Sequence, residues 1–205
     1  MINLFISYFT HPNSRRQAEI DQCLLFNLNN NYIDKIYCII DNCDNLNDKI
    51  FTNPKIEKYF ILERPTYNTF FELANKVNKP NDISIISNSD IYFDETLTKL
   101  PIIMTFNRAL ALTRWNVNLD RIDFFNRDDS QDCWIFKGQI KEIDGSFQLG
   151  RAGCDNRIAY EIKKAGYEIL NPSRTIKAYH LHSSNIRDYI PKNAIQPPYL
   201  KLLPI

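Results

Sequence analysis

Glycine is scarce in this sequence, with 5 residues in 205, and the motifs that depend on it are missing. The chain has no GxGxxG fingerprint, no phosphate-binding P-loop and no GxSxG nucleophile elbow. A glycine-rich loop therefore does not hold phosphate groups here. If the protein binds a phosphorylated ligand, a metal ion and basic side chains must neutralise it.

An excess of charge of either sign is also absent, with 25 Lys and Arg against 24 Asp and Glu. A nucleic-acid-binding surface needs a strong basic excess or stripe, so we expect no nucleic-acid partner. No apolar run approaches the ~20 residues of a membrane span. Residues 1–6 lack the basic region and small-residue cleavage site of a signal peptide. These absences predict no membrane span and a cytoplasmic location.

Cysteine pairs are missing as well. The chain has 5 cysteines, an odd number, and none stands in a CxxC pair: Cys23, Cys38, Cys43, Cys133 and Cys154. Scattered cysteines of this kind favour free thiols in a reducing compartment over a disulfide framework.

Apolar and β-branched segments alternate with helical patterns in the first half of the chain. Strands are predicted at 2–9, 35–40, 58–62 and 83–87, and helices at 15–30, with Ser14 as a cap, and at 67–77. Residues 44–53 read as a polar surface segment. This alternation predicts an α/β fold with a mostly parallel sheet and helices on both faces.

The second half has a different pattern and predicts a smaller, acceptor-binding part. Strands are expected at 109–115, 133–136, 167–170 and 176–182, with a helix at 157–165 and a polar loop at 120–132. Four prolines follow residue 190. We therefore expect one domain over residues 1–190 and a proline-rich tail or linker at 191–205.

The strand at 83–87 ends abruptly in the polar sequence Asn88-Ser89-Asp90. In open α/β sheets, ligands bind just outside the carboxyl ends of strands. A carboxylate at that point is well placed to hold a divalent cation, which takes oxygen ligands. The alternative is that Asp90 only caps a turn, since Asp is common in turns.

Three later features support a metal-dependent site. Asp155 opens a predicted helix after a loop that contains Gly153, although a plain helix cap would look the same. His180 and His182 share one strand face because side chains alternate with period two. Arg187 can neutralise a phosphate. Asp132 stands directly before an aromatic strand, where an acceptor could bind, and a purely structural role at the strand start is the alternative.

Together these segments resemble a glycosyltransferase of the GT-A fold. The hallmark of that fold is a short acidic DxD motif at the end of a central strand, and here Asn88 replaces its first acid. The stretch from Asp155 to Gly166-Tyr167 resembles the acid–helix–"aGy" signature of the family. The chain also resembles the glycosyltransferase domains encoded by large DNA viruses of algae, which would place it in the host cytoplasm.

The resemblance implies a metal-dependent enzyme that moves a hexosyl or deoxyhexosyl unit with inversion. Its donor is a nucleoside-diphosphate sugar, expected to be UDP-linked, and its acceptor is a hydroxyl of a glycan or glycoprotein. Asp90 and His182 then bind Mn²⁺ or Mg²⁺, and Asp155 is the general base. The helix N-terminus predicts a lowered pKa for Asp155. The donor contacts are expected from Ser7, Tyr8, Phe9, Arg64, Asn88, Ser89, Asp90 and Arg187.

Two functions of other classes remain open from the sequence. One is a module that binds a sugar nucleotide or carbohydrate without turnover, which the replacement at Asn88 favours. The other is a structural domain of a larger polypeptide, which the proline-rich tail permits.

Overall fold

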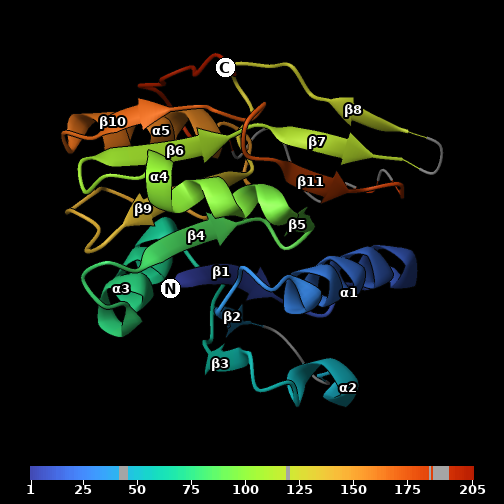
Figure 1. Cartoon of the computed structure of the whole chain (residues 1–205). Coiled ribbons are helices and arrows are strands. Elements are labelled where there is room, and N and C mark those ends of the chain that lie inside the picture. Colours follow the sequence, from blue (N-terminus) through green and yellow to red (C-terminus); the bar gives the residue numbers. More distant parts are fainter. Residues whose placement is uncertain (42–45, 119–120, 185, 187–193) are drawn as a thin grey trace.

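The computed structural model describes every residue except 42–45, 119–120, 185 and 187–193. Its larger sheet has seven strands in the order β10-β6-β9-β4-β1-β2-β3 (Figure 1). Their bounds are β1 (Ile2–Tyr8), β2 (Lys35–Ile40), β3 (Ile56–Phe60), β4 (Ile83–Ser87), β6 (Arg108–Leu112), β9 (Cys133–Lys137) and β10 (Glu168–Leu170). Neighbouring strands are parallel except at β9, which is antiparallel to both β4 and β6. The predicted mostly parallel sheet is confirmed.

Helices cover both faces of this sheet, as predicted. Helices α1 (Ser14–Asn29) and α4 (Leu100–Ile103), together with the 3₁₀ helix η1 (Glu95–Lys99), pack against one face. Helices α3 (Tyr67–Val77) and α5 (Cys154–Lys164) pack against the other. Strand β1 shows the division, because Leu4 and Ile6 join one hydrophobic cluster and Phe5 joins the opposite one. This alternation is the period of two that a strand buried on both faces requires.

Side-chain caps define where the first helices begin. The side chain of Asn13 accepts hydrogen bonds from the backbone N–H groups of Arg15 and Arg16, so Asn13 is the cap of α1 and the prediction of Ser14 is wrong by one residue. Thr66 and Thr69 form a capping box at the start of α3. Such caps satisfy N–H groups that have no partner within the helix.

A smaller sheet lies beside the first, in the order β5-β11-β7-β8. Its strands are β5 (Ile91–Phe93), β7 (Arg114–Val117), β8 (Ile122–Phe124) and β11 (Ala178–Leu181). The single strand expected at 109–115 is divided at the buried Thr113, so that β6 joins the larger sheet and β7 the smaller one. The backbone N–H of Thr113 donates to the side chains of Asn171 and Ser173 instead of to a strand.

Two segments predicted as polar and irregular contain regular elements. Helix α2 (Asp48–Phe51) lies within 44–53, and its Ile50 and Phe51 are buried in the core. Strand β8 lies within 120–132, where the ring of Phe124 packs on Trp115 at a centroid distance of 4.8 Å. In both cases one or two apolar side chains outweigh the polar composition of the segment.

The described part of the proline-rich tail, residues 194–205, lies against the domain without regular secondary structure. Its backbone N–H groups at Leu200 and Leu202 donate to the carbonyls of Asn156 and Asp128, at 2.9 and 2.7 Å. Ile195, Leu200 and Leu202 also pack on the core cluster beside α5. This part of the tail is therefore held against the domain by both hydrogen bonds and apolar contacts.

Cys23, Cys38, Cys133 and Cys154 are buried free thiols, and Cys43 lies outside the described residues. Within the part of the chain that the structure describes, no helix is long and apolar enough to span a membrane.

Candidate active site

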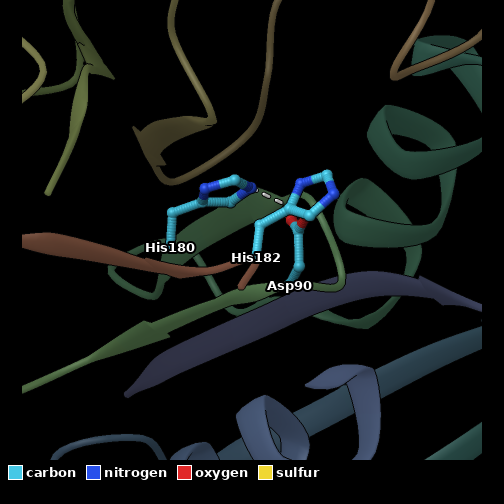
Figure 2. Close-up of side chains that lie close together, drawn as sticks. All are labelled: Asp90, His180 and His182. Atoms are coloured by element: carbon cyan, nitrogen blue, oxygen red, sulfur yellow. Dashed lines mark hydrogen bonds and ion pairs between the residues drawn. The ribbon is translucent and has the colours of Figure 1, made fainter. Parts of the chain in front are cut away.

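Asp90 lies in the turn between β4 and β5, at the carboxyl edge of the larger sheet. Its side chain is buried, and its Oδ2 lies 2.9 Å from Nε2 of His180. His180 in β11 and His182 just after it have ring centroids 5.2 Å apart. Potential metal-ligand atoms of all three residues lie within 4.8 Å of one another (Figure 2). The structure thus brings Asp90 together with both histidines of the His-x-His pattern.

Arg16 and Glu19 of α1 connect to this group. The guanidinium of Arg16 forms an ion pair with Asp90 Oδ2 and a second one, at 2.8 Å, with Glu19 Oε2. Glu19 also accepts hydrogen bonds from the hydroxyl of Ser183 and from the backbone N–H and hydroxyl of Ser184. These contacts tie α1 to the segment after β11, and every charged group in them has a partner of opposite sign or a hydrogen-bond donor.

The charges around Asp90 keep it ionised. Burial by itself raises the pKa of Asp90, but His180 and the Arg16 guanidinium outweigh burial and lower the pKa below its usual range. The pKa of His182 is lowered, first by burial and then by Arg16 and His180. An ionised carboxylate and an uncharged imidazole are the forms in which these side chains bind metals.

These residues fit a divalent cation. Asp90 Oδ1 is buried and has no hydrogen-bond partner among the described residues, so one carboxylate oxygen remains free to act as a ligand. Mg²⁺ prefers oxygen ligands in octahedral geometry, whereas imidazole nitrogens suit transition metals. A set of one carboxylate and two histidines therefore fits Mn²⁺ better than Mg²⁺.

A second polar cluster surrounds Asp132, which directly precedes β9. Asn88 donates from its side-chain amide to Asp132 Oδ1 at 3.1 Å, and its backbone N–H donates to the Asp132 carbonyl. Nη1 of Arg114 lies 3.2 and 3.1 Å from the two carboxylate oxygens of Asp132. The side chain of Asn88 thus points toward a carboxylate. An acidic side chain at position 88 would be repelled by the negative charge of Asp132.

Asp155 lies in the first turn of α5, next to this cluster. The helix starts after Gly153, at a φ of 79°, so Asp155 is not the cap residue. Burial and the charge of Asp132 raise the pKa of Asp155 to about 8, although Cys154 and Arg114 act in the opposite direction. The lowered pKa expected from the helix N-terminus is therefore wrong, because burial and a like charge outweigh the helix dipole.

The residues predicted to contact the nucleoside differ in how far they are exposed to solvent. Tyr8 is buried, and its hydroxyl donates to Asp21 Oδ1 at 2.7 Å. Ser7 and Phe9 are half-buried at the end of β1. Arg64 is exposed and donates to the Leu149 carbonyl at 2.9 Å. Arg187 lies outside the described residues, and the nucleoside contacts remain predictions.

A pocket of about 230 Å³ joins the two clusters. The histidines His180 and His182 form one side of it, and the other lining residues are Arg114, Asn116, Val117, Asn118 and Phe125. A ligand in this pocket would contact both the candidate metal group and the guanidinium that holds Asp132.

Sequence reasoning passed over two residues of this site, Arg16 and Arg114, and over one further carboxylate at a strand end, Asp41. Asp41 directly follows β2, which is parallel to β1, and its Oδ1 is buried without a partner among the described residues. Its place at a strand end, like that of Asp90, was a usable signal. Arg16 and Arg114 gave no such signal, because an arginine in a helix or at a strand start is typical of solvated surfaces.

The sequence matches no protein-family profile and no curated protein. Solved structures are similar in fold. GalNAc-T7 with UDP, GalNAc and Mn²⁺ has a TM-score of 0.66 at 10% identity, over 96% of this chain and 45% of that one. The mannosyltransferase PcManGT from Pyrobaculum calidifontis, in complex with GDP-Man and Mn²⁺, has a TM-score of 0.55 at 11% identity, over 92% and 58% of the two chains. S. aureus TarS 1–349 in complex with UDP has a TM-score of 0.53 at 11% identity, over 92% and 60%.

This chain accordingly spans between 45% and 60% of the length of these proteins. At such low identity the likeness shows the fold alone. The protein has a GT-A-like α/β fold, with a candidate metal group at the edge of the sheet where ligands of such folds bind.

Proposed function

We propose that this protein is a metal-dependent glycosyltransferase that moves a sugar from a nucleoside-diphosphate donor, UDP-linked, to a hydroxyl acceptor with inversion. One observation carries the proposal: Asp90, His180 and His182 gather their ligand atoms within 4.8 Å at the carboxyl edge of a GT-A-like sheet. Two proteins with similar folds were solved with a nucleotide or nucleotide sugar together with Mn²⁺.

In this reaction Asp90, His180 and His182 would hold the cation. A bound divalent cation supplies Lewis-acid stabilisation of the negative charge that develops on the leaving diphosphate. Asn88 and Ser89, in the same turn, are proposed donor contacts. Ser7, Phe9 and Arg64 are the proposed nucleoside contacts, and Arg187 a proposed phosphate contact.

Asp155 is proposed as the general base. The acceptor oxygen forms a bond to the anomeric carbon while the bond from that carbon to the diphosphate oxygen breaks. The electron pair of the broken bond leaves with the diphosphate, and the acceptor proton passes to a carboxylate oxygen of Asp155. A base is most effective when its pKa lies near the working pH, and the pKa of about 8 for Asp155 meets that condition.

A second candidate is a protein that binds the donor without turnover. The ion pair between Arg16 and Asp90 favours it, because it satisfies the charge of Asp90 with a side chain of the protein itself. The replacement of the first acid by Asn88 points in the same direction.

Donor turnover separates the two candidates. The purified protein is incubated with a panel of UDP- and GDP-sugars, with Mn²⁺ or with EDTA, and release of the nucleoside diphosphate is measured. We expect slow hydrolysis of at least one sugar nucleotide that EDTA abolishes. Binding of a donor with no release of UDP or GDP in any condition would favour the binding protein and contradict the transferase.

A further inference from the structure

The pocket beside the histidines is lined by hydrogen-bond donors. Arg114, Asn116 and Asn118 provide a guanidinium and two amides, and His180 and His182 provide imidazoles. Val117 and Phe125 complete the lining, and none of the described lining residues is acidic. A surface of this composition suits a ligand with many acceptor oxygens and a negative charge.

Arg114 is fixed in place before any ligand binds. Its Nη1 contacts the carboxylate of Asp132, and its Nε donates to Asn116 Oδ1 at 2.9 Å. The plane of the guanidinium lies over the ring of Phe125, with Cζ 4.1 Å from the ring centroid. No hydrogen bond from Nη2 is found within the described residues, so this nitrogen retains its donors for a ligand. A guanidinium held in this way loses little conformational entropy when it binds an anion.

Asn116 and Asn118 extend the row of donors. Because Asn116 accepts from Arg114 with its side-chain oxygen, its amide nitrogen remains as a donor. The side chain of Asn118 is exposed at the end of β7, and its backbone N–H donates to the Arg121 carbonyl. The pocket volume of about 230 Å³ is below the ~300–1,000 Å³ of sites for drug-sized ligands, which suits one sugar ring.

The position of Arg114 relates the pocket to the proposed base. The positive charge of Arg114 lowers the pKa of Asp155, and the negative charge of Asp132 raises it. Asp132 also forms an ion pair with Arg114. A group bound by Arg114 therefore lies on the side of the site where the acceptor hydroxyl loses its proton. His180 in β11 lies beside Asn116 in the neighbouring strand β7, and it belongs with His182 to the candidate metal group.

We propose that this pocket binds the acceptor sugar through an anionic substituent, a carboxylate or a phosphate ester, held by Arg114 with Asn116 and Asn118. This inference rests on the proposed function, because it assigns the pocket to the acceptor of that reaction. The free Nη2 donors of Arg114 can form charge-assisted hydrogen bonds to a carboxylate or a phosphate. A neutral sugar would leave the donors on Nη2 of Arg114 without a charged partner.

The test compares three probes on the full chain: methyl β-glucuronide, methyl β-glucoside 6-phosphate and uncharged methyl β-glucoside. Affinities are measured by NMR titration without metal or nucleotide. We expect at least one anionic probe to bind roughly tenfold more tightly than the glucoside, the size of one charge-assisted hydrogen bond. The anionic probe that binds more tightly identifies the source of the charge. Equal affinities, or no binding of any probe, would overturn the proposal.

The variant Asn118→Asp places a negative charge on the exposed rim of the pocket without removing a contact of Arg114 or Asp132. We expect it to abolish the preference for the anionic probe over the glucoside. Asn81→Asp, an equally exposed change before β4, is the matched control and should retain the preference. A preference that persists in Asn118→Asp would place the anion elsewhere and contradict the proposal.

A last arm repeats the titration with UDP and Mn²⁺ present. Retained affinity for the anionic probe supports an acceptor site beside the donor. Competitive displacement by UDP would identify the pocket as the diphosphate site and overturn the acceptor assignment. A separate titration with UDP shows whether the donor binds at all, so failure of the proposed function is distinguished from failure of this inference.

Discussion

Two carboxylates of the candidate site, the buried Asp90 and the half-buried Asp155, have opposite environments. Asp90 contacts His180 and Arg16, and its pKa is lowered. Asp155 is half-buried beside the like charge of Asp132, and desolvation together with that charge raises its pKa to about 8. The pair shows that neighbouring groups, rather than residue type, suit one carboxylate to bind a cation and the other to accept a proton.

The largest expected effect comes from Asp155→Asn. This nearly isosteric change removes the proposed base, so we expect the rate of sugar transfer to fall by roughly 10²–10⁴-fold, with UDP affinity unchanged. Steady-state kinetics and calorimetry measure the two quantities. Asp144→Asn, an exposed acid outside both clusters, serves as the control and should be neutral. Transfer at the wild-type rate in Asp155→Asn would remove the base assignment, and Asp132 would become the next candidate.

The raised pKa also predicts the pH dependence of the rate. The ionised fraction of Asp155 rises with pH and levels off above about 8. Between pH 6 and pH 8 the transfer rate should therefore increase roughly 50-fold. The charged groups that face Asp155 include Asp132 and Arg114, so the profile belongs to the cluster. A rate that is flat from pH 6 to pH 8, measured with saturating donor and metal, would show that no group with this pKa acts as the base.

The raised pKa of Asp155 also affects stability, and there the dependence on pH is opposite to that of the rate. The unfolded chain loses this proton near pH 4 and the folded chain near pH 8, so the stabilisation from the bound proton is complete below pH 4 and is lost by about pH 8. Asp155→Asn should not show this loss. Its melting temperature relative to wild type should accordingly rise between pH 5 and pH 8, which is a useful check that the variant is folded.

The two histidines are expected to have a smaller effect, on metal affinity. His182→Ala and His180→Ala should each weaken Mn²⁺ binding by roughly 10–100-fold, measured by electron paramagnetic resonance without nucleotide. The sequence favours His182 as the stronger ligand because it lies at the end of the strand. His11→Ala is the control, since His11 lies outside the candidate metal group. A larger loss in His180→Ala would reverse this assignment, and no loss in either would place the metal elsewhere.

The smallest effect is expected from Asn88→Asp, which restores the acid that the DxD motif would have. Here it replaces a donor 3.1 Å from Asp132 with a like charge. We expect a loss of about 1–3 kcal/mol in the free energy of unfolding at neutral pH. Urea denaturation measures it, with Asn81→Asp as the exposed control. An unchanged free energy together with tighter Mn²⁺ binding would show that Asn88 is only a lost metal ligand.

The sequence predicts the fold well because strand and helix periods are local. The strand at 83–87, the polar turn at Asp90 and the helix at 67–77 are all present. The break at Thr113 was not predictable, because it depends on Asn171 and Ser173, more than fifty residues away. Likewise, the pKa of Asp155 depends on Asp132, and only the folded chain brings the two together. The sequence therefore predicts the positions of these carboxylates along the elements, whereas their pKa values depend on neighbours that only the folded chain brings close.

The most direct test of the central claim is the dependence of UDP binding on Mn²⁺ in Asp90→Asn, measured by titration calorimetry beside wild type and Asp144→Asn. The account predicts that Mn²⁺ strengthens UDP binding in wild type and in Asp144→Asn. In Asp90→Asn this enhancement should be lost while circular dichroism remains native. An undiminished enhancement by Mn²⁺ in Asp90→Asn would contradict the assignment of the metal site to Asp90, His180 and His182.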